Sequence, residues 1–129
     1  MEFPRALRLV HGWLEVLTGG YEVKTAFGVF SGSLDVLCVA AVTGKRLRVL
    51  GYRFQALGSN GSIGTFSLGD TSGGGVQIGQ AWDLNPREGC IVNSGPVGFE
   101  CQTEIGQSLT VRLSNAALAC YASVIYIEV

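Results

Sequence analysis

The residues of this chain that could carry acid–base or nucleophilic chemistry are few and widely spaced. His11 is the single histidine, which removes most sites that use imidazole as a base or as a metal ligand. No GxSxG segment presents a nucleophilic serine, and the carboxylates are scattered along the chain without a recognisable pair. The sequence therefore predicts no catalytic residues, and we expect the protein not to be an enzyme.

Two glycine-containing segments match phosphate-binding loops only in part. Gly44-Lys45 is followed by Arg46, whereas a P-loop needs Ser or Thr after its lysine. Residues 73–78 place Ile78 where the dinucleotide-binding fingerprint needs a glycine, and a strand is expected to follow instead of a helix. We expect no nucleotide and no other cofactor.

The four cysteines do not have the spacing of a zinc site, so no metal is expected. Cys38 and Cys120 stand in apolar segments, where a free thiol packs as a small core residue. We expect both to be reduced core residues. Cys90 and Cys101 flank a segment that could form a hairpin, which leaves a disulfide between them open.

The overall charge gives no reason to expect a nucleic-acid or membrane partner. Nine Lys and Arg residues against ten Asp and Glu residues give a net charge of -1. The longest uncharged apolar stretch, residues 113–127, is shorter than the ~20 residues of a spanning helix. Positive charge is concentrated at four residues of one expected strand, Lys45, Arg46, Arg48 and Arg53. We favour a solvated face as their interpretation, and the alternative is contacts to an acidic partner surface.

From residue 21 onward, the apolar residues alternate or form short runs, and turn residues punctuate them at short intervals. This pattern is typical of an antiparallel β-sandwich or barrel. The polar positions change phase at Gly51, which predicts a β-bulge there. The last segment is apolar on both faces, so we expect it to be a central strand or to lie at an interface. About eight strands are expected, at residues 21–31, 34–42, 46–56, 63–68, 76–81, 89–93 continuing past a turn to 97–101, 108–113 and 119–129.

Residues 1–20 differ from the rest and are expected to form an N-terminal arm, with residues 21–129 as the sandwich domain. In a helix, Leu9, Trp13, Leu14 and Leu17 would share one side. Gly12 and the β-branched residues weaken helix propensity, so an extended arm is the alternative. In either form these apolar side chains need a surface to bury them.

Two stretches carry a resemblance to a family. VAAVTGKRLRVLGY at residues 39–52 is similar to a hairpin of small structural proteins of tailed bacteriophages. FECQTEIGQSL at residues 99–109, together with the strand at 121–129, resembles their closing loop and final strand. The likeness covers about residues 21–129, and such phrases occur in head decoration (cement) proteins and in tail-associated modules.

The resemblance implies a jelly-roll sandwich, often a homotrimer, that binds the major capsid protein on the outer surface of a phage head and stabilises the shell. It would be made in the cytoplasm of the bacterial host and located in the virion. Residues 1–20 and the four cysteines depart from the family pattern. The contacts expected with the capsid or a neighbouring subunit are Leu9, Trp13, Leu14, Leu17, Arg46, Arg48 and Arg53.

The alternative function is a carbohydrate-binding or receptor-binding sandwich of a phage tail or fibre. Trp13, Trp82 and the four tyrosines are the aromatic residues that could stack on sugars. Trp82 is the best candidate because it is expected on a loop next to Asp83, although we favour the interpretation that this tryptophan caps one end of the sandwich.

Overall fold

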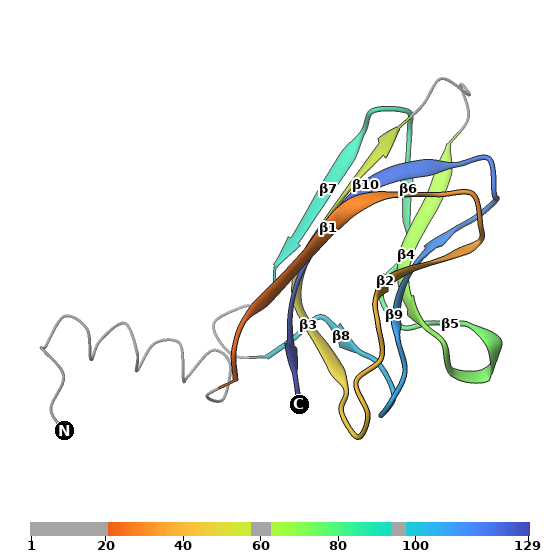
Figure 1. Ribbon diagram of the computed structural model, residues 1–129. Helices are drawn as coiled ribbons and strands as arrows, with labels where there is room; N and C mark the ends of the chain where they lie inside the picture. Colours follow the sequence, from red (N-terminus) through yellow and green to blue (C-terminus); the bar gives the residue numbers. More distant parts are fainter. Residues whose placement is uncertain (1–20, 58–62, 94–97) are drawn as a thin grey trace, which may run out of the picture.

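Two antiparallel sheets face each other across one hydrophobic core (Figure 1). The computed structural model describes residues 21–57, 63–93 and 98–129. Within these ranges, the sheet called here the β1 sheet contains β1 (Lys24–Ser31), β3 (Leu47–Leu57), β7 (Gly89–Asn93), β8 (Cys101–Gln102) and β10 (Ala119–Glu128). The β2 sheet contains β2 (Asp35–Val39), β4 (Gly64–Asp70), β5 (Val76–Gln77), β6 (Trp82–Leu84) and β9 (Leu109–Leu113), and a 3-10 turn, η1 (Ser72–Gly74), follows β4.

The strand order is that of a jelly roll. The β1 sheet has the order β1-β10-β3-β7, and the β2 sheet has the order β2-β9-β4-β5, so that β1 to β4 alternate between the two sheets. The short strands β8 and β6 pair with β3 and β4, respectively. The predicted antiparallel β-sandwich is confirmed, and the apolar last segment is indeed a central strand, because β10 lies between β1 and β3.

The bulge predicted at Gly51 is present. Gly51 is opposite Ile125, whereas Val49 is opposite Tyr126, so Leu50 is the additional residue on β3. Val49 and Tyr52 consequently both point into the core, although their spacing in the sequence is odd. A side chain at residue 51 would have little room, because its Cβ would lie 2.8 Å from the Asn93 Oδ1 atom.

The expected strand at residues 76–81 is shorter than predicted, and the expected loop around Trp82 is a strand. β5 ends at Gln77, and Trp82 then pairs with Phe66 as part of β6. Both short strands lie along β4, which the local sequence pattern does not reveal because neither is long enough to show alternation.

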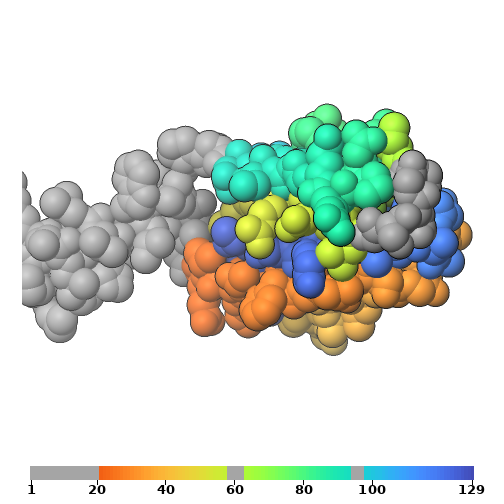
Figure 2. All heavy atoms as spheres, turned by 90° about the horizontal axis from the view of Figure 1, so that it is seen from above, coloured from red at the N-terminus to blue at the C-terminus, as the bar shows by residue number. Residues whose placement is uncertain are grey.

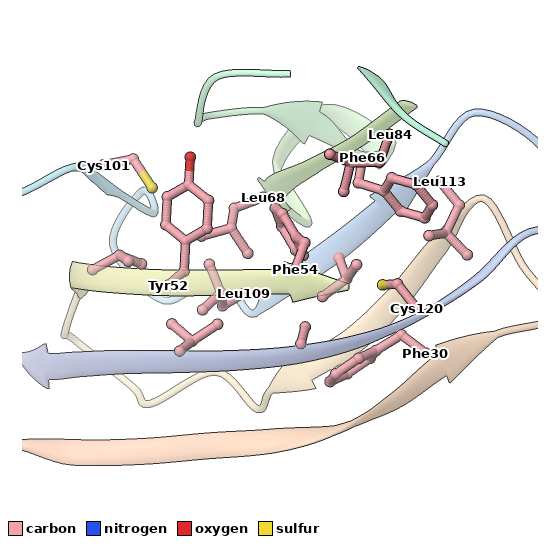
Figure 3. Close-up of a cluster of buried hydrophobic side chains, with 14 of the residues drawn as sticks. Phe30, Tyr52, Phe54, Phe66, Leu68, Leu84, Cys101, Leu109, Leu113 and Cys120 are labelled. Atoms are coloured by element: carbon pink, nitrogen blue, oxygen red, sulfur yellow. The ribbon is translucent and has the colours of Figure 1, made fainter. Parts of the chain in front are cut away.

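The core lies between the two sheets and is dominated by aliphatic and aromatic side chains (Figure 3). Phe54 is at its centre, with ring centroids 5.1 Å from Tyr52 and 6.4 Å from Phe66. The labelled side chains come from both sheets and fill the space between them: Phe30, Tyr52, Phe54, Phe66, Leu68, Leu84, Cys101, Leu109, Leu113 and Cys120.

A buried carboxylate, Asp70, holds two turns together at one end of the sandwich. The Ser72 N–H and O–H both donate to its Oδ1, the former at 3.0 Å, and the Glu104 N–H donates to its Oδ2 at 2.9 Å. Thr103 extends the connection, since its Oγ1 accepts the Leu47 N–H at 3.0 Å. The turn after β4 and the segment after β8 are therefore fixed to each other and to the start of β3.

The expected arm at residues 1–20 lies outside the described residues. Within the described ranges, no helix is long and apolar enough to cross a membrane.

Candidate functional site

The β1 sheet presents one face to the core and the other to solvent. The strand registers align the solvent-side residues in rows that run across β1, β10, β3 and β7. Figure 2 looks down on the strands in this order, from β1 in orange through β10 in blue and β3 in yellow to β7 in cyan. We call this the outer face, and it consists of Val29, Tyr121, Gln55 and Gly89 in the first row, Phe27, Ser123, Arg53 and Ile91 in the second, and Thr25, Ile125, Gly51 and Asn93 in the third.

The outer face is unusually apolar for a surface in contact with water. Phe27 is 82% exposed, Ile91 is 69% exposed and Tyr121 is 49% exposed. Val29 and Ile125 add further exposed apolar surface beside them. Large contiguous apolar patches on soluble proteins mark sites of interaction with other molecules. The outer face is therefore the strongest candidate for a binding surface in the described part of the chain.

The face is hollowed around Arg53. An open hollow of about 560 Å3 is lined by Phe27, Tyr121, Arg53 and their neighbours. Adjoining hollows of about 400 and 300 Å3 lie beside Ile91, and Arg53 lines each of them. The small residues of the face, Ser123 and Gly89, leave this space open between the larger apolar side chains.

Arg53 is electrostatically unpartnered on this face. It makes no ion pair and no side-chain hydrogen bond with any described residue, and no acidic residue occupies a position of the outer face. The centre of the face thus offers a guanidinium group to an anion that comes from elsewhere.

The other two arginines predicted as contacts differ from Arg53 because each has a partner. Arg46 lies before β3, with its guanidinium 3.8 Å from the Glu104 carboxylate. The Arg48 Nε donates to the Gln102 Oε1 at 3.1 Å, and its guanidinium stacks over Phe99 at 4.6 Å. The predicted cluster of positive charge is therefore divided, and Arg53 alone among the three lies at the centre of the apolar face.

The apolar contacts predicted at Leu9, Trp13, Leu14 and Leu17 lie outside the described residues. Sequence reasoning missed Phe27 and Ile91, the most exposed apolar residues of the face. The apolar character of both sides of the last strand was the one signal of this surface, because it includes Tyr121 and Ile125.

Trp82 does not have the exposed loop position expected of a sugar-stacking residue. It lies in β6, packs against the core, and donates its indole N–H to the Tyr52 hydroxyl at 2.8 Å. This agrees with the interpretation of Trp82 as a residue that caps the sandwich, and not with a role in stacking on sugars.

All four cysteines are free thiols, although they differ in burial. Cys120 and Cys101 are buried in the core. Cys38 is only half-buried and packs against the core, so it is not fully the core residue that we expected. Burial raises the pKa of Cys38, Cys101 and Cys120 to about 12, and it also raises the pKa of Cys90. The reactive thiolate is therefore scarce at neutral pH.

We expect iodoacetamide to alkylate Cys90 before Cys101 and Cys120 in the native protein at pH 8, because Cys90 is only half-buried and the other two are buried. Raising the pH toward 10 should increase its rate before theirs. In denaturant without reductant, mass spectrometry should find all four cysteines alkylated. A peptide that links Cys90 to Cys101 would contradict the expectation.

No group of three or more His, Cys, Asp or Glu residues in residues 21–57, 63–93 and 98–129 is arranged to hold a metal ion. The outer face is characterised by apolar surface and one cation, Arg53.

The comparisons with known proteins give a likeness at the level of the fold. No protein family and no curated protein matches the sequence. Among solved structures, the chain is similar to one from the acidic stable capsid structure of Helicobacter pylori bacteriophage KHP30, with a TM-score of 0.53 and 13% sequence identity. The match covers 84% of this chain and 94% of that chain. Both are therefore small chains that consist mainly of this one sandwich.

Proposed function

We propose that this protein is a decoration (cement) protein of a bacteriophage capsid, which binds the outer surface of the head and stabilises the shell. The observation that carries the proposal is the fold match, because it spans nearly the whole of a small chain within a capsid structure. The apolar outer face supports a binding role, since a protein that acts by contributing interface area needs such a surface.

In this role the protein contributes contacts instead of chemistry. The major capsid protein would be its partner, and we propose that the chain is a homotrimer in which residues 1–20 carry part of the attachment. Trp13 and the neighbouring leucines are large apolar anchors of the kind that dominate interface energetics. A trimer that engages three shell subunits would gain effective concentration for its second and third contacts, so weak individual contacts would give durable attachment.

The purified chain is expected to bind undecorated heads of its phage saturably and to raise the temperature at which they release DNA. Cosedimentation measures the occupancy, and light scattering measures the mass of the free protein.

Removal of residues 1–20 is expected to lower the affinity for the heads by at least about tenfold, the effect of losing one good anchor. The circular dichroism spectrum of the truncated chain must match that of the full chain, because the comparison requires that both are folded.

Full occupancy and equal heat protection by the truncated chain would contradict the role of the arm. Absence of binding by the full chain would contradict the decoration function itself. Binding to defined glycans on an array, without binding to heads, would favour the tail or fibre alternative.

A further inference from the structure

We propose that the outer face of the β1 sheet is the surface that docks on the shell, and that Arg53 binds a carboxylate of the shell protein that is surrounded by apolar atoms. This inference rests on the proposed function and assigns the surface and the partner chemistry that the function requires. It differs from attachment through the arm, because it concerns residues of the sandwich itself.

All three rows of the outer face contain exposed apolar side chains. Phe27 stands at one edge of the middle row and Ile91 at the other, and both are more than two-thirds exposed, at 82% and 69%. Tyr121 and Val29 extend the first row, while Ile125 extends the third. Aromatic residues and arginine are enriched in the central part of protein interfaces, and both residue types occur here.

Arg53 lies in the middle row of the outer face, between Ser123 and Ile91. Covering the face with a partner would remove water from this guanidinium group, and a buried charge without a counter-ion is strongly unfavourable. No described residue of the protein supplies that counter-ion. A partner that covers the face must therefore present an anion opposite Arg53, and a carboxylate matches the guanidinium through two parallel hydrogen bonds.

A second copy that pairs face to face is a poor occupant of this surface. If two outer faces paired about a twofold axis through their centre, the two Arg53 groups would approach each other without an acidic residue between them. Like charges opposed in this way cost binding energy. A shell surface with a carboxylate has no such conflict.

On the opposite side of the sandwich, the arginine has a carboxylate partner within the protein. On the β2 sheet, the Arg112 Nε lies 2.9 Å from the Asp35 carboxylate. The side chain of Arg112 also covers Gly69, where an added Cβ would lie 2.6 Å from its Cδ. Leu37 nevertheless remains 58% exposed on β2 and provides an apolar control outside the outer face.

The test is cosedimentation of full-length variants with undecorated heads. Arg53→Glu and Phe27→Ala are each expected to weaken binding by at least about tenfold, as for the loss of an interface anchor. Arg53→Lys should bind better than Arg53→Gln, and Arg53→Gln better than Arg53→Glu, because the lysine keeps the charge. The matched controls, Lys45→Glu for charge reversal and Leu37→Ala for apolar truncation, should change binding by less than about twofold.

Five results would overturn or redirect the inference or the function on which it rests. Wild-type binding by Arg53→Glu and Phe27→Ala would overturn it and leave the decoration function intact, whereas failure of the unmodified chain to bind would reject that function. Equal binding by Arg53→Gln and Arg53→Glu would reject the carboxylate partner. Loss of the oligomer in these variants would assign the face to a second copy. The Arg53 and Phe27 variants could also have a lower thermal midpoint of unfolding than the unmodified chain. If that difference is absent once residues 1–20 are removed, the outer face is covered by residues 1–20 of the same chain.

Discussion

Phe54→Ala is expected to lower the free energy of unfolding by about 3–5 kcal/mol, the usual loss for a buried phenylalanine. Phe54 is fully buried and lies in contact distance of the aromatic rings of Tyr52 and Phe66, between the two sheets (Figure 3). Its removal leaves a cavity that the surrounding β-strands cannot close without losing their register. Urea denaturation followed by tryptophan fluorescence measures the change.

The control for Phe54 is Phe27→Ala on the neighbouring part of the same sheet. Phe27 carries the same side chain on the opposite face and is 82% exposed, so its truncation should change stability by less than about 0.5 kcal/mol. Similar losses for the two variants would contradict the assignment of the inner and outer faces. The pair therefore tests both the core and the candidate binding face.

Asp70→Ala is expected to lower the free energy of unfolding by about 3 kcal/mol, because several hydrogen bonds to one buried charged group are lost together. The Ser72 and Glu104 N–H groups would lose their common acceptor, which is 1% exposed. Asp70→Asn should cost less, since its amide oxygen can still accept one of these bonds. Thermal unfolding by circular dichroism measures both variants.

Asp83→Ala is the matched control for the buried carboxylate. Asp83 accepts a hydrogen bond from the Thr65 hydroxyl at 2.6 Å, but both residues lie at the surface. Its loss should change stability by about 0.5–1 kcal/mol, as for an ordinary hydrogen bond. An effect at Asp70 no greater than that at Asp83 would show that the two turns are held by other contacts.

The strands of the sandwich could be predicted because their alternation and turn residues are local signals. The bulge at Gly51 was also predictable, since a change of phase within one strand is visible in the sequence. The short strands β5 and β6 were not, because they exist through pairing with β4 and have too few residues for a pattern. Trp82 was misplaced on a loop for the same reason.

The candidate site was predictable only in part. The local sequence does not distinguish Arg46, Arg48 and Arg53. They differ in whether they have a partner, and the partners come from far along the chain: Glu104 pairs with Arg46 and Gln102 with Arg48. The exposure of Phe27 also depends on long-range structure, because alternation in β1 does not tell which side of the strand faces the core. Only the assembled sheet identifies Arg53 as the unpartnered cation within an apolar surface.

The place of β10 in the middle of its sheet has a consequence for biosynthesis. β1 and β3 do not pair with each other, and each pairs with β10, which is synthesised after both of them. The β1 sheet therefore cannot close until residues 119–128 have left the ribosome, and until then the inner apolar residues of β1 and β3 lack the strand that lies between them. A chain that ends before β10 lacks Tyr121, Ser123 and Ile125, and with them the middle of the outer face.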